Sequence, residues 1–159
     1  MQNTANVDTR FSVWLLLGQT ADAMARVRER ELRQHRISLS QSAILLIAEA
    51  IGDKATPAEI ARRLLRKPAS VTGIINRMAQ SGLVMKVKDL PKKNFIRVVL
   101  TEKGRKLYNY SLKRMAVEHV MSSLSEDELQ QLRSYLETLR TAALKELGWK
   151  PRGTLAQLV

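Results

Sequence analysis

Hydrogen-bonding side chains cluster in the middle of the chain, where Ser70, Thr72, Asn76 and Arg77 follow one another closely. Hydroxyl groups suit contacts to phosphate oxygens and base edges, an asparagine amide can pair with adenine, and a guanidinium can bind guanine or a phosphate. Gly73 stands among them and lets the backbone approach closely without offering a side-chain contact. We interpret these five residues as a candidate surface for nucleic acid. The alternative is that Ser70 only caps a helix and Arg77 makes a structural ion pair.

A second group of candidate residues is cationic. Lys92, Lys93 and Arg97 lie in and beside the connection between two β-rich stretches, while Arg62 and Lys67 precede the polar cluster. Positive charges at these places suit DNA phosphates, with a β ribbon reaching the minor groove and the other two cations flanking the major groove. Because lysine lacks the planar fork of arginine, such a ribbon should read sequence less specifically. The alternative is a charged edge that prevents aggregation between sheets.

Hydrophobic periodicity predicts the elements that must position these side chains. Residues 68–80 carry apolar side chains at the spacing of one buried helix face, which leaves the polar cluster on the other face. A short helix capped by Thr56 precedes this segment, and two β-rich runs, 83–88 and 95–100, follow it. The order helix, turn, helix, β ribbon is that of a winged helix-turn-helix. The apolar positions of the second helix are Val71, Ile74, Ile75 and Met78.

Long helical patterns flank this winged region. Residues 8–36 are predicted to form one helix that is apolar in its first half and basic in its second, and residues 102–122 another. A last helix starts at Ser125, where three acidic residues suit the first turn. The apolar half of the first helix needs a partner, most simply a second copy of the chain. We therefore expect a mainly α fold with a small β wing, in one domain over 1–159: a winged helix-turn-helix core at 38–101 flanked by N- and C-terminal dimerisation helices at 8–36 and 102–159.

Composition narrows the classes of function. The formal net charge of +12 and the sequence pI near 10.5 predict attraction to a polyanion such as nucleic acid. The chain has no cysteine and two histidines far apart in sequence, so we expect no metal site and no thiol chemistry. We find no catalytic motif and expect no enzyme activity. No export signal and no apolar run of membrane-spanning length is visible, which favours a soluble, cytoplasmic protein.

Three segments together resemble the MarR family of bacterial transcriptional regulators. Residues 56–64, TPAEIARRL, are similar to the family pattern t-x-x-e-L-A-x-x-L, and residues 70–84 are similar to its s-x-v-T-r-l-v-d-r-L-e-x-x-G-l-v. Asp89 followed by the run 98–104, VVLTEKG, is similar to D-x-x-D-r-R-x-x-x-V-x-L-T-x-x-G. The chain differs from the family pattern at one position of the second helix, where the family commonly has arginine. It also differs at wing positions where the family usually has aspartate or arginine. The departing residues are Gly73, Lys92, Lys93 and Asn94.

The resemblance implies a function and its partners. A MarR-like chain would be a homodimeric, sequence-specific DNA-binding regulator that acts on a palindromic site in double-stranded DNA, as a repressor released by a small-molecule effector. Two other classes stay open. One is a winged-helix protein-interaction module, for which the unusual Gly73 and the lysine wing leave room. The other is a non-specific architectural DNA-binding protein.

An effector site is also implied by the resemblance. Family members often bind a small, frequently anionic aromatic molecule in a cleft between the dimer helices and the winged region, and no other cofactor is expected. The alternative for each candidate is plain packing, because large apolar side chains at helical spacing usually belong to a core. The candidate residues are Trp14, Met24, His35, Ile44 and Tyr108.

The lysine wing gives a first testable prediction. Replacing Lys92 and Lys93 with alanine should weaken DNA binding and reduce the slope of log affinity against log salt by up to about two per chain, because each phosphate contact releases condensed counterions. Affinity titrations at several salt concentrations measure both quantities. Unchanged affinity together with an unchanged slope would remove the wing from the interface.

Overall fold

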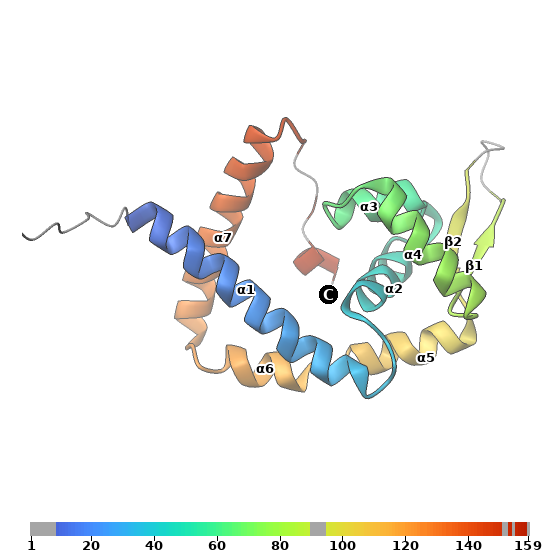
Figure 1. Cartoon of the computed structure of the whole chain (residues 1–159), viewed down its shortest axis with the longest axis horizontal. Coiled ribbons are helices and arrows are strands. Elements are labelled where there is room, and N and C mark those ends of the chain that lie inside the picture. The colour runs from blue at the N-terminus through green and yellow to red at the C-terminus, as the bar shows by residue number, and fades with distance from the viewer. Residues whose placement is uncertain (1–8, 90–94, 151–152, 154, 159) are drawn as a thin grey trace, which may run out of the picture.

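The computed structural model describes residues 9–89, 95–150, 153 and 155–158. It is mainly helical with one small antiparallel sheet, which confirms the predicted fold class. Figure 1 shows the sheet at one end of the molecule and the first and last long helices at the other. The elements in chain order are α1 (Thr9–Arg33), α2 (Leu39–Ile51), the 3-10 turn η1 (Gly52–Lys54), α3 (Pro57–Arg63), α4 (Pro68–Gln80), β1 (Val84–Val87), β2 (Arg97–Leu100), α5 (Glu102–Ser111), α6 (Met115–Met121), α7 (Glu126–Glu146) and the 3-10 turn η2 (Leu155–Leu158).

The core lies within the winged region, where α2, α3 and α4 pack together and against the sheet. On α4, Val71, Ile75 and Met78 are completely buried and Ile74 is half-buried, as the helical spacing predicts. The opposite face of α4 is thereby turned outward. Ser38 caps α2 in a capping box with Gln41. Fully buried side chains from α2, α3 and the two strands pack around those of α4. They include Ile44, Leu45, Ile47, Ile60, Val84 and Val98.

The sheet is a two-stranded ribbon. Val84 of β1 pairs with Leu100 of β2, and Val87 pairs with Arg97. Both strands are shorter than the runs 83–88 and 95–100 that the sequence predicts, and the connection at 90–94 lies outside the described residues. The N–H of Val98 donates to the carbonyl of Ala55 at 2.8 Å, so the segment before α3 also holds β2.

A close backbone approach joins the sheet to α5. The Thr101 hydroxyl donates to the carbonyl of Gly82 at 2.6 Å and accepts from the N–H of Gly104 at 3.0 Å, which caps the first turn of α5. A Cβ atom at Gly104 would lie 2.0 Å from the carbonyl oxygen of Leu83, inside any allowed contact. Only glycine fits this position. Gly82 has a φ of +73°, which also favours glycine and lets the chain leave α4 for β1.

The structure contradicts the prediction of one helix over 102–122. Two helices, α5 and α6, occupy this range, and Arg114 between them has φ −105° and ψ 37°, outside the helical region. No proline or glycine marks the break, which is why local sequence did not reveal it. At this break the chain meets α1, which packs on α6.

Two side chains of α1 satisfy the backbone groups that this break leaves without helical partners. Arg28 donates to the carbonyl of Ser111 and, at 3.4 Å, to the carbonyl of Lys113. Glu31 accepts from the N–H of Ala116 at 3.1 Å and pairs with Arg28. Burial raises the pKa of Glu31, but the amide of Ala116 and the guanidinium of Arg28 outweigh it and hold the pKa below its ordinary value.

The outer helices expose much of their apolar surface. Six large apolar side chains in the first half of α1 are between 38% and 63% exposed, and several on α7 are also exposed. Of α7, Leu144 alone is buried among the described residues. The chain then returns to the winged region, where Leu155 and Leu158 of η2 pack against the core beside α2. The sequence predicted neither this return nor η2.

The contact between Glu31 and Ala116 predicts a pH-dependent stability. Because folding lowers the pKa of Glu31, its contribution to the free energy of unfolding is present above pH 4.5, the ordinary pKa of this group. That contribution is lost as pH falls through the folded pKa. Glu31→Gln should lower the free energy of unfolding at pH 7 by about 1–3 kcal/mol, and the difference from the unmodified chain should shrink below pH 4.5. Denaturant melts at several pH values measure this.

The matched control is Glu137→Gln, which removes the carboxylate of an exposed pair with Arg133 on α7. This substitution should change stability by less than about 0.5 kcal/mol. A pH-independent deficit in Glu31→Gln would contradict the assignment.

Candidate nucleic-acid interface

The outward face of α4 carries the polar cluster. Ser70, Thr72 and Arg77 are exposed, while Gly73 and Asn76 are half-buried. Lys67 rather than Ser70 occupies the N-cap position of α4, so the alternative that Ser70 is only a cap does not hold. None of the ion pairs among the described residues involves Arg77. Hydroxyl and guanidinium donors thus point to solvent from one helix.

Asn76 is tied to the sheet. The ammonium of Lys86 on β1 donates to the side-chain oxygen of Asn76 at 2.6 Å. Pairing with adenine needs this oxygen as an acceptor and the amide nitrogen as a donor. A carbonyl oxygen has two lone pairs and can accept from Lys86 and from a base together. The contact orients the amide and brings a cation to the edge of the polar face.

Arg97 is held at the base of the wing. Its Nε donates to the Asp89 carboxylate at 3.0 Å, and its Nη1 lies 3.4 Å from Asp53. The hydrogen bond from Arg97 holds the pKa of Asp89 below its ordinary value, and Asp89 in turn raises the pKa of Arg97. A DNA phosphate contacting Arg97 would have to share the guanidinium with these carboxylates. The predicted DNA contacts Lys92 and Lys93 lie outside the described residues.

The cations before α4 differ in their surroundings. Arg62 and Arg63 both pair with the Glu59 carboxylate on α3, and the N–H of Glu59 donates to Thr56, the predicted cap of that helix. Lys67 is exposed at the start of α4. Arg62 therefore carries less uncompensated charge toward the surface than Lys67 does.

The structure does not bring the five predicted ligand-binding residues together in one chain. Ile44 is completely buried in the core, and His35 stacks on Tyr110 with ring centroids 4.1 Å apart. Trp14 is 63% exposed near the start of α1, roughly 30 Å along that helix from its end near His35. Met24 and Tyr108 are half-buried, and Tyr108 packs against the core.

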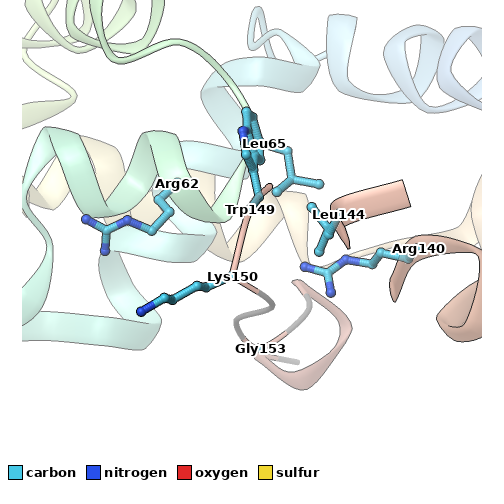
Figure 2. A pocket seen from close by; sticks show the side chains of 7 residues that line it. All are labelled: Arg62, Leu65, Arg140, Leu144, Trp149, Lys150 and Gly153. Atoms are coloured by element: carbon cyan, nitrogen blue, oxygen red, sulfur yellow. The ribbon is translucent and has the colours of Figure 1, made fainter. Parts of the chain in front are cut away.

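A cavity that sequence reasoning missed lies where the chain returns from α7 toward α3. It has a volume of about 320 Å³. Three cationic side chains and one tryptophan, from segments far apart in the sequence, contribute to its lining. No sequence motif marks it, because the tertiary fold brings these segments together. The lining residues, drawn in Figure 2, are Arg62, Leu65, Arg140, Leu144, Trp149, Lys150 and Gly153.

The part of the chain that the structure describes contains no group of three or more histidine or acidic side chains placed to hold a metal ion. None of its helices combines the length and apolar character needed to cross a bilayer.

The outward polar face of α4, the packing of α3 against α4 and the β1–β2 ribbon define a winged helix-turn-helix protein. Residues 37–97, from just before α2 to the start of β2, match the model of the MarR family. This match over the winged region agrees with the resemblance to the MarR family of transcriptional regulators that the sequence motifs indicate. Members of the family are regulators and not enzymes, which agrees with the expectation of no catalysis.

Solved structures and curated relatives agree with this assignment. The organohalide-sensing regulator RdhR shares 28% identity in its ligand-free form, with a TM-score of 0.82 over 96% of this chain and 95% of that one. Its form bound to 2,4-dichlorophenol shares 29%, with a TM-score of 0.80 over 91% and 86%. A homoprotocatechuate degradative operon repressor of Escherichia coli is 31% identical over 70 residues, 43% of this chain and 47% of the repressor. The S. aureus MepR–DNA complex shares only the fold, at 22% identity and a TM-score of 0.73 over 81% and 96%.

The exposure of Arg77 leads to a prediction. If Arg77 binds guanine, Arg77→Ala should cost about 1–3 kcal/mol of DNA affinity and relax the sequence preference at one base pair. If Arg77 binds a phosphate, the slope of log affinity against log salt should fall by about one. Lys106→Ala is the matched control, because Lys106 is an exposed cation on α5 that pairs with Glu102 across one turn. Equal effects of the two substitutions would show that only net charge matters.

Proposed function

We propose that this chain is a homodimeric, sequence-specific DNA-binding regulator of transcription that acts in the cytoplasm on a palindromic operator. The observation that carries the proposal is the two-sided nature of α4. Its apolar side is sealed in the core, whereas Ser70, Thr72 and Arg77 face solvent. A helix held in this way can enter the major groove with donors toward base edges.

The wing and the cations around α4 supply the electrostatic part of the proposed interface. The net charge of +12 favours a polyanion, and Lys67 and Lys86 add positive charge at the margins of the polar face. We assign Arg62, Lys92 and Lys93 to phosphate contacts. Arg97 stays a proposed contact, and its pairing with Asp89 suggests that it first serves to fix the wing.

Exposed apolar surface supports the proposed dimer. A monomer rarely leaves so many large apolar side chains on one helix in water, and a second copy would cover them. Symmetric pairing would place two α4 helices about one DNA turn apart, roughly 34–36 Å, which matches a palindromic site. On this view 1–159 is one domain with a winged region at 38–101 and dimerisation helices at 8–36 and 102–159. The exposed apolar residues of α1 are Phe11, Val13, Trp14, Leu15, Leu16 and Leu17.

Two relatives support repression that a small molecule relieves. The E. coli relative is a degradative operon repressor, and RdhR binds 2,4-dichlorophenol. We infer that this chain likewise represses until a small aromatic or anionic effector binds. In the dimer, Trp14, Met24, His35 and Tyr108 are candidates to contact it, together with residues of the second copy. Ile44 would act only by supporting the core.

Footprinting tests the proposal. The protein should protect a palindromic segment in the DNA upstream of its own gene. If the dimer neutralises on the order of 6–10 phosphates, affinity should fall by roughly 10³–10⁵ between 50 and 200 mM salt. A scrambled sequence of the same composition is the control. Equal affinity for both sequences would identify a non-specific architectural protein instead, and the absence of protection at low salt would overturn the proposed function.

A further inference from the structure

The hydrogen bond between Asn76 and Lys86 fixes which way the Asn76 amide is turned. β1 packs along α4 (Figure 1), and the Lys86 ammonium donates to Oδ1 of Asn76 at 2.6 Å. An ammonium has three donors and no acceptor, so the amide atom that faces it must be the oxygen. The amide nitrogen of Asn76 is therefore directed away from Lys86.

Asn76 lies on the face of α4 that points away from the buried apolar stripe. Gly73, one turn earlier, shares this face because it is three residues away. A Cβ atom at Gly73 would meet the guanidinium of Arg77 at 3.7 Å, and without one this position adds no side chain in front of Asn76. A base edge can thus approach Asn76 more closely than it could past a long side chain at position 73.

Together the two side chains present mainly hydrogen-bond donors. With one N–H of Lys86 used on Asn76, the ammonium keeps two donors, and the amide nitrogen of Asn76 keeps its own two. Lys86 is exposed, and none of the ion pairs among the described residues involves it. Its positive charge is therefore available beside the amide.

An edge that carries donors matches one purine better than the other. In the major groove guanine offers two acceptors, N7 and O6, whereas adenine offers the acceptor N7 and the donor N6 amino group. The second lone pair of Oδ1 could accept from that amino group, but the amino group would then lie against the Lys86 ammonium, donor against donor. The bond to Lys86 thus favours guanine over the adenine that a free asparagine amide suits.

We propose that Asn76 and Lys86 act as one unit that selects guanine at a defined position in each half of the operator. Donors of the two side chains would bind N7 and O6 of the same base. Lys86 is then a specificity-determining residue on the wing strand, although it lies outside the helix that enters the groove. This proposal rests on the proposed function, because it names a base that the same surface reads.

Selection from a pool of random DNA duplexes tests the proposal without a known operator. Lys86→Met keeps the apolar stem and removes the ammonium, which frees Oδ1 of Asn76 to accept from adenine. At one position in each half of the enriched site, guanine should give way to adenine. The unmodified chain should prefer guanine there by roughly tenfold, and this ratio should fall to about one or reverse in Lys86→Met.

The matched control is Lys88→Met. It removes the same charge from an exposed position two residues farther along and leaves the contact between Lys86 and Asn76 in place. This variant should bind all duplexes more weakly, because an electrostatic contribution is lost, and should keep the preference for guanine.

A second variant keeps the bond but changes what the pair presents. Asn76→Asp has nearly the same shape and can accept from Lys86, while its carboxylate has acceptors where the amide had donors. On the duplex that the unmodified chain enriches, the ratio of affinities for guanine and adenine should fall to within about twofold of one. If Lys86→Met does not fold, this variant and the base analogues decide.

Base analogues test the contact on the DNA side with the unmodified chain. 7-Deazaguanine at the selected position lacks the N7 acceptor and should weaken binding roughly tenfold. Inosine keeps N7 and O6 and lacks only the minor-groove amino group, so it should bind as guanine does.

The outcomes separate this proposal from the proposed function. A palindromic site whose base preferences are unchanged in Lys86→Met, a change shared by Lys88→Met, or equal binding of 7-deazaguanine would overturn the guanine assignment and leave sequence-specific binding intact. A pool in which no sequence is enriched would overturn both. A change from guanine to adenine in Lys86→Met alone, with weaker binding of 7-deazaguanine, would support the assignment.

Discussion

Burial of one face of α4 is the constraint on which the rest of the structure depends. Val71, Ile75 and Met78 are fully enclosed by α2, α3 and the strands, so α4 cannot rotate about its axis without exposing apolar surface to water. Because side chains on a helix point in directions fixed by its period, the same packing sets where Ser70 and Arg77 point. The chemistry of the polar face is thus a consequence of the core behind it.

Polar contacts between distant segments attach the outer helices to this core. Arg28 and Glu31 of α1 bind the backbone where α5 gives way to α6, and the return after α7 brings Leu155 and Leu158 back beside α2. Neither attachment covers the apolar half of α1, which therefore stays available to a second copy. The arrangement separates the surface proposed for DNA from the surface proposed for dimerisation.

Features that neighbouring residues specify were predicted correctly from the sequence, whereas features that depend on contacts between distant segments were not. The amphipathic pattern of α4, the cap at Thr56 and the stop at Gly82 are written in neighbouring residues, and the structure agrees with each. The break after Ser111 escaped prediction, because no proline or glycine marks it and the side chain of Arg28 that contacts it is remote in sequence. The cavity at Trp149 escaped for the same reason, since no pattern in the chain relates α3 to the segment after α7.

The glycine at 104 has a mechanical consequence. The carbonyl of Leu83 occupies the space that a Cβ at position 104 would need, and the Thr101 hydroxyl bonds both this carbonyl and the N–H of Gly104. The start of α5 is therefore held firmly against the start of the wing. The next break in the helical backbone after this junction is the short stretch 112–114, between α5 and α6. There the stretch is tied to α1 instead, because the side chain of Arg28 donates to the carbonyls of Ser111 and Lys113.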